Sequence, residues 1–262
     1  MRKQIFLGLV LVLLAPAAAV AQSNFNGTWK IDTSKERGST KPYVYLLQNG
    51  MYHCSSCVPP INIKADGMDH KIVGSPYIDA SSVKVVDERT VEITTKKGGK
   101  VVGTSKLAAS ADGKTLALAF TDSSNTNSDP VTGSATLKQV SPGPAGSHAV
   151  SGSWVLAKFN QSDNGLTFTI MVHGDEVMMS SPTGQSYTAK LDGPDAPYKG
   201  DPGTTSVSVK RVGANTIVET DKRNGKPIGV GHMTVSADGK TMTIVNTDEL
   251  TGRVFHDVAV KQ

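Results

Sequence analysis

The chain has 262 residues, of which 38% are apolar, 5% aromatic and 19% charged, and its formal net charge is +4. This length accommodates one large domain or two ordinary ones. Blocks of like charge are short, which excludes a disordered acidic tail and a basic nucleic-acid-binding arm. Without Arg2 and Lys3, which belong to the leader described next, the balance falls to +2. We therefore expect no nucleic-acid partner, and charge alone indicates no other.

The first 21 residues have the features of a cleaved signal peptide. Residues 1–3 are a short basic start, residues 5–14 are almost uninterruptedly apolar, and small residues, Ala19 and Ala21, occupy the two positions that a signal peptidase reads. The apolar stretch is shorter than the roughly 20 residues of a membrane span, and no Cys follows it as a lipid-anchor site. We predict cleavage after Ala21, no membrane span after cleavage, and a bacterial periplasmic or secreted protein in an oxidising compartment.

The remainder of the chain repeats itself once. The segment Ser-Ala-Asp-Gly-Lys-Thr at 110–115 returns at 236–241, and at nearly the same offset Trp29 corresponds to Trp154. So long a period indicates two domain-sized units rather than a solenoid. The predicted organisation is a signal peptide at 1–21, a first unit at 22–140, a Pro- and Gly-rich linker at 141–148, and a second unit at 149–262.

Each unit is predicted to be all-β. Residues 90–95 and 116–120 are β-rich or alternate with period two, and the two Ala-Asp-Gly-Lys segments have the composition of hairpin turns. A meander of about eight to ten sequential strands must curl and close to hide its edges. We therefore predict two tandem antiparallel β-meander units that form lipocalin-like barrels or half-barrels.

The start of each unit carries a family resemblance. Residues 25–30, Phe-Asn-Gly-Thr-Trp-Lys, resemble the opening strand of lipocalins and fatty-acid-binding proteins, and residues 152–154 repeat the Gly-x-Trp. The resemblance implies that Trp29 and Trp154 pack across the closed end of a barrel. Fatty-acid-binding proteins insert a helical pair after this strand, for which residues 35–41 leave no room.

The chain after the leader also resembles a group of exported bacterial tandem-repeat proteins of unknown function. The shared segments are Cys-x-x-Cys at 54–57, Lys-Ala-Asp-Gly at 64–67 and Ala-Asp-Gly-Lys-Thr at 111–115. This resemblance implies export and duplication, and it implies no activity.

The two cysteines, Cys54 and Cys57, favour a structural disulfide. Haem attachment requires a His directly after the second Cys, where Val58 stands. Zinc requires two further ligands, and the nearest histidines, His53 and His70, lack the spacing. Thiol–disulfide exchange relies on a Cys at a helix N-terminus, which the following Pro-Pro opposes. A redox role remains the less favoured alternative to the structural disulfide.

No other pattern indicates catalysis or a metal. The six histidines are scattered, and methionines of the second half replace leucines of the first, as in a packed core. The adjacent acids Asp87 and Glu88, like Asp175 and Glu176, fall in expected turns and point in opposite directions. Nucleophile and phosphate-binding motifs are missing from the sequence. We predict a protein that is not an enzyme and has no metal and no cofactor.

The favoured function is non-catalytic binding of a small apolar or amphipathic molecule, which loses its water shell in a barrel mouth. The candidate pocket residues are Tyr43, Tyr45, Phe168 and Met171, and Arg253 is the candidate partner of an acidic head group. The alternative is a cell-envelope interaction module that binds a protein or polysaccharide. A cavity above about 300 Å³ with apolar walls would favour the carrier, whereas a filled core with an exposed apolar patch would favour the module.

Overall fold

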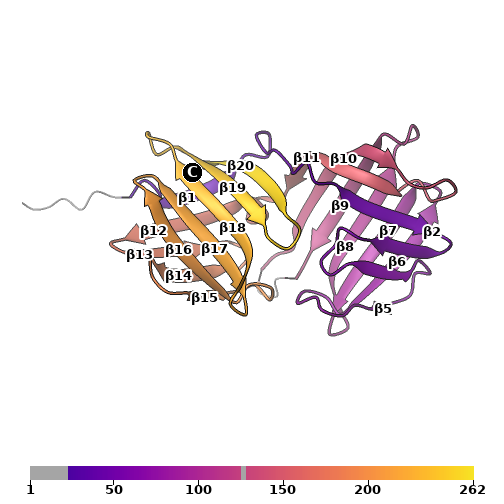
Figure 1. Cartoon of the computed structure of the whole chain (residues 1–262), viewed down its shortest axis with the longest axis horizontal. Helices are drawn as coiled ribbons and strands as arrows, with labels where there is room; N and C mark the ends of the chain where they lie inside the picture. The colour runs from indigo at the N-terminus through magenta and orange to yellow at the C-terminus, as the bar shows by residue number, and fades with distance from the viewer. Residues whose placement is uncertain (1–22, 125–127) are drawn as a thin grey trace, which may run out of the picture.

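The computed structural model describes residues 23–124 and 128–262, so the predicted leader at 1–21 lies outside the described residues. The described chain is almost entirely β and forms two antiparallel sheets of ten strands each, one a closed barrel and the other nearly closed. The two barrels lie next to each other along the long axis of the molecule (Figure 1). The prediction of two antiparallel, barrel-like meanders is therefore confirmed.

The nearly closed sheet, called the first barrel, is built mainly from the first half of the chain. In spatial order its strands are β4 (Ile61–Lys64), β3 (Met51–Cys54), β2 (Tyr43–Gln48), β11 (Gly152–Gln161), β10 (Val131–Pro142), β9 (Thr115–Asp122), β8 (Lys100–Ala109), β7 (Thr90–Lys97), β6 (Ala80–Asp87) and β5 (His70–Lys71).

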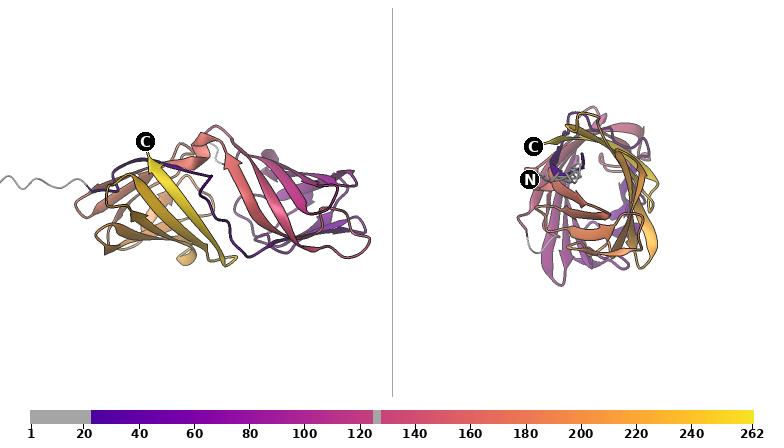
Figure 2. Two further views of the ribbon diagram at one scale, coloured as in Figure 1. Left: turned by 90° about the horizontal axis from the view of Figure 1, so that it is seen from above. Right: turned by 90° about the vertical axis from the view of Figure 1, so that its left-hand side faces the viewer.

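The closed sheet, called the second barrel, is built mainly from the second half. Its strands follow one another as β1 (Gly27–Ile31), β12 (Thr167–His173), β13 (Glu176–Ser180), β14 (Ser186–Lys190), β15 (Ala196–Lys199), β16 (Ser206–Gly213), β17 (Thr216–Arg223), β18 (Lys226–Val235), β19 (Thr241–Asp248) and β20 (Arg253–Lys261), after which β20 returns to β1. Seen along the long axis, these strands form a ring (Figure 2, right). The short helix α1 (Asp163–Leu166) precedes β12.

The two halves exchange their first strands. Strand β1 belongs to the first half by sequence, yet it closes the second barrel by pairing with β12 and β20. Strand β11 opens the second half, yet it lies in the first barrel between β2 and β10. Each barrel therefore receives the strand that completes it from the opposite repeat.

Because of the exchange, the two barrels do not coincide with the predicted units at 22–140 and 149–262. Residues 141–148, predicted as a linker, belong to the β10–β11 hairpin, in which Ser141 pairs with Ser153. The chain instead crosses between barrels at residues 32–42, which continue along β20 (Figure 2, left), and at α1. The sequence could not show this, because β1 and β11 carry the same pattern and either could fill either position.

Each barrel has its own apolar core, with an exchanged tryptophan in it. Trp29 is fully buried in the second barrel and Trp154 is fully buried in the first. The two indoles are held alike: Trp29 Nε1 donates to the Phe25 carbonyl at 2.8 Å, and Trp154 Nε1 donates to the Val150 carbonyl at 3.1 Å. Both tryptophans are thus structural residues whose polar edge is satisfied within the core.

The two Ala-Asp-Gly-Lys segments form turns of the same geometry. Gly113 and Gly239 both have φ of 69°, a region that suits glycine. In each turn the preceding serine hydroxyl donates to the aspartate carboxylate at 2.6 Å. Among the described residues, no helix is long and apolar enough to cross a membrane.

Strand exchange predicts that a core mutation in one repeat destabilises the barrel of the other. We expect Trp29→Ala to cost about 3–5 kcal/mol, because it empties a buried aromatic site. Hydrogen exchange followed by mass spectrometry should show faster exchange in β12–β20, whereas Trp154→Ala should affect β2–β10. Faster exchange confined to the mutated residue's own repeat would contradict the exchange.

Candidate functional site

The second barrel encloses a cavity of about 450 Å³. Its walls are mostly apolar, and the side chains that form them come from five different strands. They are Phe168, Ile170, Met179, Met233, Ile244 and Phe255. Helix α1 lines the cavity too, so the cavity reaches the end of the barrel where the chain crosses between the two halves.

A second cavity, of about 490 Å³, lies in the first barrel. Gln185 lines both cavities, and so the open ends of the two barrels face each other. At this junction the Tyr77 hydroxyl of the first half donates to Asp201 Oδ1 of the second at 3.1 Å. The two cavities are therefore neighbours separated by a few polar side chains.

Two carboxyl groups project into the cavity of the second barrel. Glu219 and Asp221 lie two residues apart on β17, so they point to the same, inward face. The Tyr187 hydroxyl of β14 donates to Glu219 Oε2. Asp221 Oδ1 is inaccessible to solvent and has no hydrogen-bond partner among the described residues.

The environment of this pair disfavours its ionised form. Burial raises the pKa of Glu219 to about 8, and the neighbouring Asp221 carboxylate raises it in the same direction. Burial, followed by the negative charge of Asp201, raises the pKa of Asp221 to about 6. Two carboxyls this close cannot both ionise cheaply, so the pair titrates as one unit.

The pKa values of two further acids on the same barrel are also raised. Burial, and then the charge of Asp257, raises the pKa of Glu36 in the crossing segment to about 7. Burial also raises the pKa of Asp257 on β20. The second barrel therefore holds four carboxyls whose ionisation is opposed by the fold.

Of the five residues predicted to contact ligand, the structure places Phe168 in this cavity. Met171 lies on the outer face of the same strand and is 42% exposed, because residues three apart on a strand face opposite sides. Tyr43 and Tyr45 pack against the core of the first barrel, where Tyr45 stacks on Tyr52. Direct ligand contacts of the other four residues stay predictions, and the proposals below do not use them.

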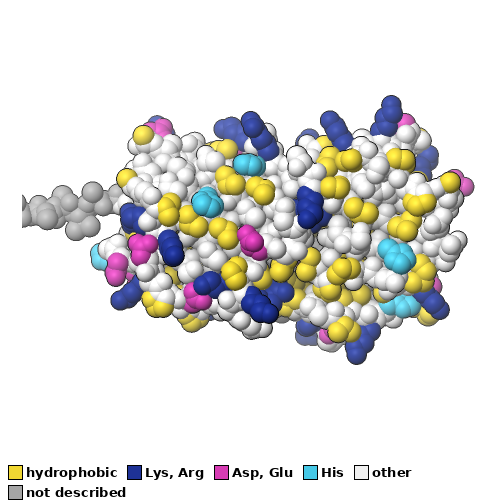
Figure 3. Space-filling view, in the orientation of Figure 1, with side chains coloured by type: hydrophobic (Ala, Val, Ile, Leu, Met, Phe, Trp, Pro, Cys, Tyr) yellow, Lys and Arg dark blue, Asp and Glu magenta, His cyan; other side chains and the backbone are white. Residues whose placement is uncertain are grey.

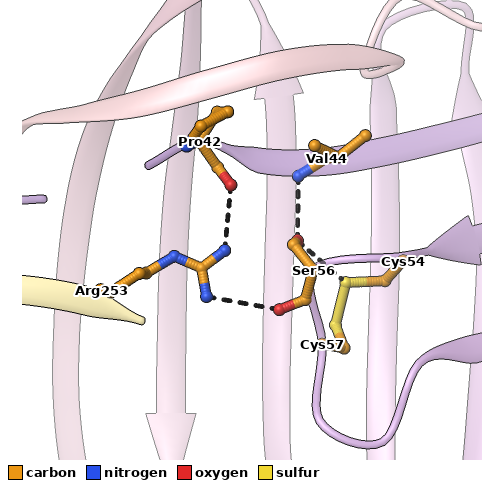
Figure 4. Close-up of a disulfide and its surroundings, with 6 residues drawn as sticks. All are labelled: Pro42, Val44, Cys54, Ser56, Cys57 and Arg253. Atoms are coloured by element: carbon orange, nitrogen blue, oxygen red, sulfur yellow. Dashed lines mark hydrogen bonds between the residues drawn. A yellow bond between two sulfur atoms is a disulfide. The ribbon is translucent and has the colours of Figure 1, made fainter. Parts of the chain in front are cut away.

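Arg253, the predicted partner of an acidic group, links the two barrels. Its Nη2 donates to the Pro42 carbonyl at 3.0 Å and its Nη1 donates to the Ser56 carbonyl at 3.4 Å (Figure 4). Its guanidinium also lies 4.3 Å from the centre of the Tyr43 ring. The side chain is almost wholly buried. Arg253 therefore has a structural role at the junction.

The disulfide loop positions Ser56, whose carbonyl is one of the two acceptors of Arg253. Cys54 and Cys57 are joined by an S–S bond of 2.00 Å, which confirms the predicted pair. The Ser56 hydroxyl between them accepts a hydrogen bond from the Val44 amide at 2.9 Å (Figure 4). The disulfide loop thus holds Ser56 between its own barrel and Arg253 of the other.

Glu219 and Asp221 were not among the residues predicted from the sequence, although a signal was present. The acid pairs named from the sequence were adjacent residues, which face opposite sides of a strand, whereas Glu219 and Asp221 are separated by one residue. Ile217, Glu219 and Asp221 form an alternating inward row on β17. Acids in such a row indicate a polar group inside a barrel. Among the described residues, no group of three or more His, Cys, Asp or Glu side chains could hold a metal ion.

Comparison with known proteins identifies no relative. A scan against models of protein families finds no match, and a search of curated proteins finds none either.

Loss of Arg253 should weaken the junction. Arg253→Met leaves the Pro42 and Ser56 carbonyls without their charged donor and removes the contact with Tyr43, so we expect a loss of about 2–4 kcal/mol of unfolding free energy. Urea denaturation would measure this loss. The exposed Arg211→Met on β16 is the matched control and should change stability by less than about 0.5 kcal/mol; equal effects of the two substitutions would exclude the linking role.

Stability should fall as the pH rises through the neutral range. The folded state holds protons on Glu219, Asp221 and Glu36 that the unfolded state has already released, so raising the pH from about 5 to about 8 favours unfolding. We expect Glu219→Gln to flatten this dependence, measured as the urea midpoint against pH. The exposed Glu176→Gln should leave it unchanged. A midpoint that rises over this interval would contradict the raised pKa values.

Proposed function

We propose that the protein is a non-catalytic binding protein that carries a small amphipathic molecule in the cavity of its second barrel. The observation that supports this most is a cavity of about 450 Å³ whose lining combines apolar side chains with convergent polar ones. Its volume lies within the range of roughly 300–1,000 Å³ that small-molecule sites have.

Binding would follow from desolvation. An apolar group that leaves water for this cavity gains roughly 25 cal/mol for each Å² it buries, and the cavity exists before the ligand arrives, so little of that gain is used to reorganise the barrel. The closed core around Trp29 provides a rigid end opposite the junction. The predicted leader supports export, so we propose that the carrier acts in the periplasm or the medium.

The proposal can be tested with the neutral fluorophore N-phenyl-1-naphthylamine, which brightens in apolar surroundings. We expect saturable binding to the protein without its leader, and at least tenfold weaker binding to Gly229→Leu. A Cβ at Gly229 meets no atom closer than 3.7 Å and lies beside Asp221 on the cavity wall, so the leucine fills the cavity without a clash at its base.

Thr243→Leu is the matched control, because Thr243 is exposed on the neighbouring strand β19. It should bind the fluorophore as the unchanged protein does. Native mass spectrometry of protein purified from its own periplasm without detergent would show any ligand acquired there as an added mass. Absence of fluorophore binding, or equal binding by Gly229→Leu, would overturn the proposal and favour the envelope interaction module.

A further inference from the structure

The acids in the cavity wall have no counter-ion. The described residues that line the cavity include Glu219, Asp221 and Asp248, and none of them is Lys, Arg or His. The five ion pairs within the described chain all lie elsewhere. On the face shown in Figure 3, the Lys and Arg side chains are spread over the outer surface of both barrels. Positive charge is therefore available outside the barrel and missing within the cavity.

Apart from one arginine, the rest of the pair's surroundings are neutral or acidic. Arg223, two residues beyond Asp221 on β17, donates from Nε to the Gly203 carbonyl at 2.6 Å and is in none of the five ion pairs of the described chain. Strands β16 and β18, on either side of β17, present Val209 and Gly231 to Glu219. The titratable groups that influence the pair are the phenols of Tyr187 and Tyr198 and the carboxyl of Asp201. Phenols and carboxyls are uncharged when protonated and negatively charged when deprotonated, so none of these groups can neutralise a carboxylate.

The barrel fold itself does not require these acids, as the first barrel shows. There β7 pairs Ile93 with Val83 and Ser105, in the same register in which β17 pairs Glu219 with Val209 and Gly231. Ile93 therefore occupies the position of Glu219, and Thr95 occupies that of Asp221. The first barrel forms with an apolar and a neutral side chain at these two sites.

Glu219 and Asp221 thus cost free energy of folding that neutral side chains at the same two sites would not cost. A buried carboxylate without a counter-ion costs free energy, and Glu219 and Asp221 both line the cavity without one. A cation in that volume would remove the cost, since it supplies both a charge and hydrogen-bond donors. The apolar walls beyond the pair require that the rest of such a ligand be hydrocarbon-like.

We propose that the cavity of the second barrel binds a small amphipathic amine, with its ammonium group against Glu219 and Asp221 and its apolar body against Phe168, Met233 and Ile244. This inference rests on the proposed carrier function and names the chemical class of its ligand. An ammonium group offers three N–H donors for the carboxylate oxygens that face the cavity. Binding of the cation favours the fully ionised pair, so it displaces the proton that the two carboxyls share at neutral pH.

The test compares three ligands that share an eight-carbon chain and differ in their head group. Octylamine, 1-octanol and octanoate would each compete with N-phenyl-1-naphthylamine at pH 7.5. We expect octylammonium to bind at least tenfold more tightly than octanol, and octanoate to bind most weakly. Equal affinities of octylamine and octanol would overturn the amine assignment, while fluorophore binding would still support the carrier. Failure of the fluorophore to bind would overturn both.

Two variants tie the preference to the pair. Glu219→Gln and Asp221→Asn should each reduce the advantage of octylamine over octanol by at least tenfold. Circular dichroism would verify the fold of each. Glu176→Gln, which removes one exposed charge from β13, is the matched control and should retain the full preference. An undiminished preference in both cavity variants would exclude the pair as the cation's site.

Proton release gives a readout that a general electrostatic effect would not. Calorimetric titration of octylamine into the protein, in two buffers of different ionisation enthalpy, should show close to one proton released per ligand near pH 7. The preference for octylamine should increase from pH 5 to pH 8. Zero proton release throughout this range would contradict displacement of the shared proton.

Discussion

A β-barrel is complete only when its last two edges find a hydrogen-bonding partner, and in this molecule each barrel obtains that partner from the other half of the chain. Strand β1 occupies the space between β12 and β20, and β11 occupies the space between β2 and β10. An unpaired edge exposes a row of backbone donors and acceptors to aggregation. The exchanged strand therefore covers two strand edges in each barrel, and neither barrel can lose it without exposing them; the first barrel still has β4 and β5 as its outer strands.

The same constraint places the candidate site. Because the chain crosses between barrels at residues 32–42 and at α1, the two crossings lie at the ends of the barrels that face each other. Arg253, Ser56 and the Tyr77–Asp201 contact then fix the junction. The cavities open toward this junction, while the tryptophan cores form the opposite ends.

Features that are determined by residues close in sequence could be predicted. Strands with alternating polar and apolar residues and the Ala-Asp-Gly-Lys turns are of this kind, so the all-β meander follows from them. The Cys54–Cys57 disulfide likewise depends on only four residues. The exchange of strands was not predictable in this way, because Gly27-Thr28-Trp29 and Gly152-Ser153-Trp154 would make the same contacts in either barrel. Only the geometry of the two crossings decides between them.

The site was predictable in part, for a similar reason. Phe168 follows from its place on the same strand face as Ile170, whereas Met171, three residues along, lies on the opposite face, and its ligand contact stays a prediction. The acidic pair was visible as alternation on one strand, but its meaning depends on groups far away in sequence. Tyr187 comes from β14, and the missing counter-ion is a property of the whole wall. The role of the acidic pair can therefore be inferred only once the arrangement of the strands in the closed barrel is known.

Strand order also bears on how the protein can be made. The N-terminal strand β1 emerges first from the ribosome and, if the chain is exported as proposed, first from the export channel. Its neighbour β20 follows every other strand of the second barrel in chain order, and so emerges after them. The second barrel cannot close until β20 has been delivered, and the edge of β1 that pairs with β20 must stay open throughout that interval. Such long-range closure is slow and leaves edges open to other chains, so a cell that makes this protein needs to shield its first strand until its last one arrives.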